Sequence, residues 1–260
     1  MYEVFSSGGG TQSACISALI VQGKLPKPDF MVIADTGREC DTTWQYMDAV
    51  VRPAMADIGV DVHRIGPEWQ SMPAHGRNYQ THNENTLLIP VFTSQNGDSG
   101  KLSGFCSTAW KIEVVNRYLS RTFGITRSKY RKWIGFSLDE WRRAQRMMMG
   151  DEYQKGQIRF PLIVDVPLKR HEAIREVERM GWPTPPRSRC WMCPNQADDE
   201  WRGLSQDEFA KAVQFEAELQ TVDPHAWLHK SCTPLTQVDF EAEPTLFDSG
   251  NYCNSGVCFV

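Results

Sequence analysis

The chain has 260 residues, 41% of them hydrophobic and 23% charged, and its formal net charge of −4 at pH 7 gives no overall attraction to nucleic acid. No run approaches the roughly 20 apolar residues of a membrane span, and the N-terminus enters the first expected strand without a basic and apolar leader. We therefore expect a cytoplasmic protein with no membrane partner, large enough for an α/β domain with an appendage, whose eight cysteines stay reduced.

A glycine-rich turn follows the first expected strand and opens an apolar helix. Its residues are Ser7, Gly8, Gly9, Gly10, Thr11, Gln12 and Ser13. Consecutive glycines expose backbone amides, which together with the hydroxyls and the positive end of the helix make a cradle for a phosphate-like anion. The lysine of the common Gly-x-x-x-x-Gly-Lys-Ser/Thr loop is missing. The turn predicts an oxyanion site of another kind, with a plain strand-to-helix link as the alternative.

The second expected strand, 30–34, ends in Asp35, Thr36 and Gly37. These residues place a carboxylate, a hydroxyl and a flexible turn at the carboxyl edge of the sheet, where open α/β sheets bind ligands. We expect Asp35 to hold a nucleotide ribose, an adenine edge or Mg²⁺. The alternative is that Asp35 caps its own turn.

The rest of the chain continues the alternation of strands and helices. Further strands are expected at 60–65, 130–136 and 158–164, while periodicity is lost over 66–105. The pattern predicts an α/β fold in which a five-stranded, mostly parallel sheet has helices on both faces. Residues 1–200 would form this domain, with 66–105 as a loop insertion. Residues 201–260 would form a C-terminal helix and an irregular, cysteine-containing tail.

Three cysteines have spacings suited to a metal. Cys190 and Cys193 form a Cys-x-x-Cys pair of the kind found in zinc sites, iron–sulfur sites and redox dithiols. Cys106 lies 84 residues upstream at the mouth of an expected helix, and Lys111 follows in its first turns.

In this order, the motifs resemble the phosphoadenosine phosphosulfate (PAPS) reductase family of the N-type ATP pyrophosphatase superfamily. The glycine-rich turn resembles the superfamily's Ser-Gly-Gly-x-x-Ser pyrophosphate loop, and Cys106 to Lys111 resembles the family's Cys-Cys-x-x-Arg-Lys element. The resemblance covers roughly residues 3 to 200. It implies an adenine nucleotide alpha hydrolase-like fold with ATP or PAPS bound by residues 7–13 and 35–37. It also implies a [4Fe-4S] cluster on Cys106, Cys190 and Cys193, with Lys111 and Arg143 in catalysis.

Two departures from the family pattern affect the expected chemistry. Ser107 replaces the second cluster cysteine, which leaves three ligands and one open iron. The family's C-terminal Glu-Cys-Gly-Leu-His motif is absent, so Cys258 is the candidate for the thiolate that attacks sulfur.

The leading interpretation is a sulfur-chemistry enzyme that reduces or transfers sulfur on a bound adenine nucleotide, with a thiol reductant as a further candidate partner. One alternative is an ATP-dependent nucleobase or tRNA thiolase, for which aromatic and basic residues around 127–133 would suit stacking on nucleic acid, although the negative net charge does not favour it. A second alternative is a non-catalytic nucleotide-binding module with structural zinc. The sequence leaves open whether the chain forms a homo-oligomer.

Overall fold

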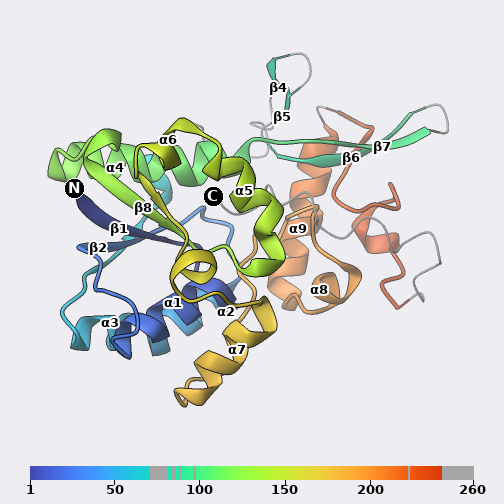
Figure 1. Cartoon of the computed structure of the whole chain (residues 1–260). Helices are drawn as coiled ribbons and strands as arrows, with labels where there is room; N and C mark the ends of the chain where they lie inside the picture. The colour runs from blue at the N-terminus through green and yellow to red at the C-terminus, as the bar shows by residue number, and fades with distance from the viewer. Residues whose placement is uncertain (71–80, 84–85, 88, 96–97, 222, 242–260) are drawn as a thin grey trace. The chain divides into compact units, whose positions relative to one another are not determined.

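A computed structural model describes residues 1–70, 81–83, 86–87, 89–95, 98–221 and 223–241 (Figure 1). These residues group into two units, each of which combines two separated parts of the chain. Unit 1 contains Met1–Trp69 and Lys111–Arg189, and unit 2 contains the described residues of Gln70–Trp110 and Cys190–Cys258. The division differs from the expected one at residue 200, because most of the 66–105 insertion belongs with the C-terminal residues.

Five parallel strands form the sheet of unit 1, in the order β3-β2-β1-β8-β9. The strands are β1 (Tyr2–Ser7), β2 (Phe30–Ala34), β3 (Val62–Ile65), β8 (Tyr130–Ile134) and β9 (Ile158–Arg159). The strand order reverses between β1 and β8, and such a reversal opens a crevice at the carboxyl ends of the strands. The predicted α/β class and five-stranded parallel sheet are confirmed.

Helices cover both faces of this sheet. They are α1 (Thr11–Val21), α2 (Asp41–Tyr46), α3 (Arg52–Asp57), α4 (Glu113–Phe123), α5 (Trp141–Met148), α6 (Asp151–Gln154) and α7 (Arg170–Arg179). Phe5 and Trp133 of the sheet share a core with residues of α1, α3 and α7, whereas Val4 and Tyr130 face a core that contains α4. Successive strand residues point to opposite faces, so the two cores lie on opposite sides of the sheet (Figure 1).

Prolines lie within or next to two irregular elements of unit 1. β9 stops after Arg159, and Pro161–Asp165 forms one π-helical turn, η7, where the sequence predicted strand up to residue 164. A proline cannot donate to a strand ladder, which accounts for the shorter strand. The helix that contains Pro53 is continuous from α2 to α3 and includes a π-helical segment, η1 (Met47–Val51).

Unit 2 has its own small sheet and its own core. The antiparallel strands β6 (Val91–Gln95) and β7 (Asp98–Leu102) pair with each other, and β10 (Ala226–Trp227) pairs with β6. The remaining elements are β4 (Thr81–Asn83), β5 (Thr86–Leu87), α8 (Asp198–Arg202) and α9 (Gln206–Gln220). Strands thus occur inside the stretch that the sequence suggested was irregular. Among the helices that the structure describes, none combines the length and apolar character needed to cross a membrane.

Candidate functional site

The glycine-rich turn lies between the end of β1 and the start of α1. Gly9 has φ +74°, and a Cβ there would lie 2.7 Å from Cγ2 of Thr43 and 3.0 Å from Cδ1 of Ile33. A Cβ on Gly10 would lie 2.9 Å from the backbone nitrogen of Ser188. The turn therefore requires glycine at both positions, at the first because of conformation and space, at the second because of space.

Two serines brace the turn from either side. The Gly9 amide donates to Ser7 Oγ at 3.0 Å, and the Gly8 amide donates to Ser13 Oγ at 2.9 Å. These two hydroxyls, which the sequence suggested as ligand groups, hold the loop's own backbone.

Helix α1 has no capping or acidic side chain of its own at its N-terminus. Gly10 is the N-cap, no side chain caps the helix, and the first turn contains no acidic residue. The first-turn amides of a helix have no partner inside the helix, and their partial positive charge favours an anion. Thr11 and Ser13 in this turn are buried, and Gln12 is half-buried. The loop therefore has the form of an anion site.

The Asp35 side chain is engaged on both oxygens. Oδ1 accepts the Gly37 amide at 2.7 Å, and Oδ2 accepts Nε and Nη2 of Arg64 at 2.9 and 2.6 Å. The Arg64 guanidinium also stacks on Trp44, 3.6 Å from the ring centroid. Gly37 has φ +73°, and Thr36 Oγ1 accepts the Arg38 amide at 3.2 Å. Asp35 caps its own turn, which was the alternative interpretation, and it also orients an arginine that the sequence analysis did not single out.

Lys111 lies in an ion pair that sequence reasoning missed. Its Nζ is 2.9 Å from Oε1 of Glu39, and the two side chains are only 15% and 3% exposed. Ser188 Oγ donates to the other oxygen of Glu39 at 3.3 Å. This pair connects the turn after β2 to two distant segments of unit 1. The stretch 35–39 contains a second acidic residue, Glu39, and that was the available sequence signal.

Arg143 is tied to the glycine loop through Glu140. Glu140 Oε1 pairs with Arg143, and Oε2 accepts Gln12 Nε2 at 3.1 Å. Ser137 and Glu140 form a capping box, since Glu140 also accepts the Ser137 amide at 3.4 Å. The Arg143 guanidinium lies 4.3 Å from the ring centroid of Phe136. Glu140 therefore links the first turn of α1 to the predicted anion-neutralising arginine.

The three predicted metal cysteines all belong to unit 2 and are partly exposed. Cys106 begins a helical stretch, and the Cys193 amide donates to the Cys190 carbonyl at 3.0 Å, which confirms the tight turn. Cys106 and Cys190 pack against the same apolar core. In the part of the chain that the structure describes, no three His, Cys, Asp or Glu side chains form a metal-holding group. The donor chemistry nevertheless suits an iron–sulfur cluster or zinc, since both take thiolates.

The other cysteines divide into structural ones and ones outside the described residues. Cys15 is fully buried in the core of unit 1, and burial raises the pKa of its thiol to about 12, as expected for an inert core residue. Cys258, the predicted attacking thiol, lies outside the described residues.

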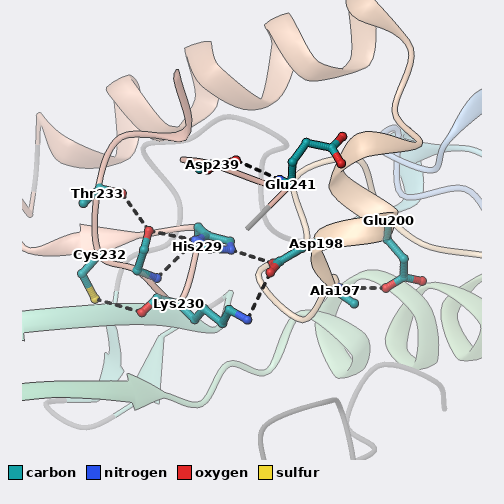
Figure 2. Close-up of polar contacts among 10 residues, drawn as sticks. Ala197, Asp198, Glu200, His229, Lys230, Cys232, Thr233, Asp239 and Glu241 are labelled. Carbon is teal, nitrogen blue, oxygen red and sulfur yellow. Dashed lines mark hydrogen bonds and ion pairs between the residues drawn. The ribbon is translucent and has the colours of Figure 1, made fainter. Parts of the chain in front are cut away.

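Cys232 belongs to a polar loop of unit 2 (Figure 2). Asp198 Oδ1 is 2.9 Å from Nε2 of His229, and Oδ2 is 3.2 Å from Nζ of Lys230. Burial raises the pKa of Asp198, but the hydrogen bonds from these two residues outweigh it and lower the pKa overall. His229 Nε2–H then donates to the carboxylate, and Nδ1 accepts from the amide and hydroxyl of Ser231 at 3.2 and 2.8 Å.

The surroundings of the Cys232 thiol do not favour its thiolate form. Burial raises its pKa more than a hydrogen bond from Ser94 lowers it. Its backbone has φ 53°, and its amide donates to the His229 carbonyl at 3.1 Å. These features are those of a residue that shapes the loop.

Comparison with known proteins finds no matching family model, no similar curated protein and no similar solved structure.

Proposed function

We propose that the chain is a cytoplasmic, PAPS reductase-like enzyme of sulfur chemistry that binds an adenine nucleotide on unit 1. The observation that carries the proposal is the glycine loop at the carboxyl end of β1, with its close-packed Gly9 and Gly10 and the uncapped first turn of α1. A nucleotide's phosphates or phosphosulfate suit this site, because backbone amides and a helix N-terminus stabilise an oxyanion. Residues 7–13 would hold the anion.

Arg143 and Lys111 would offset the charge of the bound anion. Glu140 and Glu39 already hold these two cations, so each is oriented before a ligand binds. In the reductive reaction, a thiolate, for which Cys258 is the candidate, attacks the sulfur of the phosphosulfate. The new S–S bond forms as the S–O bond breaks, and adenosine 3′,5′-bisphosphate leaves. A second thiol then displaces sulfite and leaves a disulfide.

Cys106, Cys190 and Cys193 would hold the [4Fe-4S] cluster of this proposal. Three cysteine ligands leave one iron open to a sulfur ligand, and that is the chemistry which the cluster would supply when bound. Zinc, the other candidate, normally takes four protein ligands in a structural site.

The second candidate function is ATP-dependent thiolation of a nucleobase. Ser107, which stands where the family has a second cluster cysteine, favours it, because this side chain is 5% exposed and the position offers no thiol. Here the loop would bind the pyrophosphate of ATP, with Mg²⁺ as its usual counterion. A nucleotide-binding module with structural zinc remains the non-catalytic form of the proposal.

Anaerobic purification followed by iron, sulfide and zinc analysis is the first test. We expect iron and acid-labile sulfide, with release of sulfite and adenosine 3′,5′-bisphosphate from PAPS in the presence of a dithiol. Replacing Cys106, Cys190 or Cys193 by serine should abolish both the visible colour of the iron–sulfur cluster and catalytic turnover. The Cys15→Ala variant should keep both. Stoichiometric zinc without iron would overturn the cluster. Release of pyrophosphate or AMP from ATP, with no sulfite from PAPS, would favour the thiolase.

A further inference from the structure

Helix α5 and its C-cap residue, Met149, expose a set of side chains that the proposed nucleotide site does not use. These are Trp141, Arg142, Gln145, Arg146 and Met149, and together we name them the outer face of α5. At about 100° per residue, they lie within an arc of about 140°. Ala144, on the opposite side of the helix, is fully buried. The outer face is therefore one continuous surface.

The composition of this face is unusual for a solvated helix. Trp141 is 44% exposed and Met149 is 79% exposed, although both are large and apolar. The helix has no acidic residue between Trp141 and Met148. A purely solvated surface would not require an exposed indole beside two arginines.

The positive charge of the face is not neutralised by its neighbours. Among the residues that the structure describes, neither Arg142 nor Arg146 has an ion pair or a hydrogen-bond partner. The carboxylates near these arginines in the sequence have other partners. Glu140 pairs with Arg143, and Asp151 pairs with Lys155 at 3.0 Å. Asp139 Oδ2 accepts the backbone amide of Arg170. The face thus carries two uncompensated cations although the whole chain is acidic.

We propose that the outer face of α5 binds a single-stranded nucleic acid. Arg142 and Arg146, one helical turn apart, pair with two backbone phosphates, and Trp141 stacks on an unpaired base. Charge complementarity selects a polyanion, and an exposed indole selects a strand whose bases are free to stack. The proposal does not depend on the sulfur chemistry of the nucleotide site.

The outer face of α5 begins next to a residue that contacts the glycine loop, and this suggests a role for nucleic-acid binding. Trp141 directly follows Glu140, which accepts the side-chain amide of Gln12 in the first turn of α1. A strand held on α5 would therefore be held next to the residues that connect to the glycine loop. A polynucleotide substrate whose base is modified at the expense of a nucleotide needs such a surface.

Fluorescence anisotropy with a labelled, mixed-sequence DNA oligonucleotide tests the proposal on the full chain. Binding should weaken linearly in log–log form between about 50 and 200 mM salt, since each phosphate contact on a single strand adds about 0.7 to the slope. The double variant Arg142→Gln/Arg146→Gln should reduce that slope by about 1.4. Trp141→Ala should weaken binding by about 5- to 150-fold with the slope unchanged.

A matched control removes the same charge elsewhere. Arg121 and Arg175 are exposed arginines on α4 and α7, and the double variant Arg121→Gln/Arg175→Gln should bind like the parent. Equal weakening by both double variants, or no binding by the parent at low salt, would overturn the proposal. Equal affinity for the single strand and for the matched duplex would also overturn it. The same holds if Trp141→Ala changes only the oligomeric state, measured by light scattering, and not the affinity for DNA. ATP and PAPS binding by calorimetry on the same variants reports separately on the nucleotide site.

Discussion

The side-chain amide of Gln12 donates to Oε2 of Glu140 at 3.1 Å, and this bond joins the first turn of the loop helix to a residue 128 positions later. The other oxygen of Glu140 pairs with Arg143. One carboxylate therefore fixes both a residue of the glycine loop and Arg143, the cation that we propose offsets the charge of the anion. If the proposed nucleotide site is correct, removing the Glu140 charge should weaken nucleotide binding, because Glu140 positions both groups.

The first prediction concerns this link. Glu140→Gln keeps the shape of the side chain and a residue that can complete a capping box, but it removes the charge that holds Arg143. We expect nucleotide affinity to fall about tenfold, because hydrogen bonds to charged groups contribute about 1.5–3 kcal/mol. Calorimetry measures the affinity, and Asp151→Asn, which breaks an exposed pair nearby, should leave it unchanged. If Glu140→Gln binds the nucleotide as tightly as the parent protein does, Glu140 has no role in nucleotide binding.

The second prediction concerns Gly9. An added Cβ meets Thr43 and Ile33 in the interior, so alanine there should destabilise unit 1 by about 2 kcal/mol or more, through strain at positive φ and overpacking. Gly23 has the same kind of φ, +72°, with open space around it, so Gly23→Ala should show the strain alone. Urea unfolding measures both. If Gly9→Ala and Gly23→Ala lose the same amount of unfolding free energy, the residues around Gly9 accommodate the added methyl group without cost.

The third prediction concerns Lys132 on β8, which is 6% exposed. Burial is the main cause that lowers its pKa, to about 8, with Arg127 adding to it. The unfolded chain therefore holds more protons than the folded one between about pH 8 and the ordinary lysine pKa of 10.5, and stability rises with pH across that window. The buried charge costs roughly 3 kcal/mol below pH 8.

Lys132→Met should therefore stabilise the protein at pH 7 and flatten the rise in unfolding free energy above pH 8. Lys129→Met changes an exposed lysine of the same segment and should do neither. Denaturant titrations at pH 7 and above pH 10 compare the three proteins. An unchanged pH profile in Lys132→Met would mean that this lysine titrates normally in the folded chain.

The fourth prediction concerns Glu216 of α9, which is 3% exposed. Its two oxygens accept the backbone amides of Leu228 and Leu235 at 3.0 and 2.7 Å, so one carboxylate closes both ends of the loop that contains His229. Glu216→Ala leaves two buried amides unpaired and should cost about 2–4 kcal/mol. Glu218→Ala, exposed on the same helix, should cost far less. Hydrogen exchange at Leu228 and Leu235 should speed up only in the first variant.

Local patterns were enough to predict the parallel sheet, because strands and helices alternate and β2 is a continuous apolar run. The capping box at Ser137 was also a local signal. The hairpin β6–β7 was missed although Asn96 and Gly97, a strong hairpin dipeptide, separate its strands in the sequence. The ion pair of Lys111 with Glu39 was also missed. The sequence shows a second carboxylate in the stretch 35–39, but which residue pairs with it depends on the distant segments that the fold brings together.

Each unit combines two segments that are separated in the sequence, and this order affects how the chain folds during synthesis. The first segment of unit 2 ends at Trp110, and 79 residues of unit 1 leave the ribosome before Cys190, where its second segment begins. At roughly 5–20 residues per second this wait is about 4 to 16 s, during which β6 has no β10 to pair with and its apolar side chains have no finished core. We expect a nascent chain in that state to bind chaperones, because it exposes apolar surface and an unpaired strand edge. A chain truncated after residue 189 would keep this strand permanently without that partner.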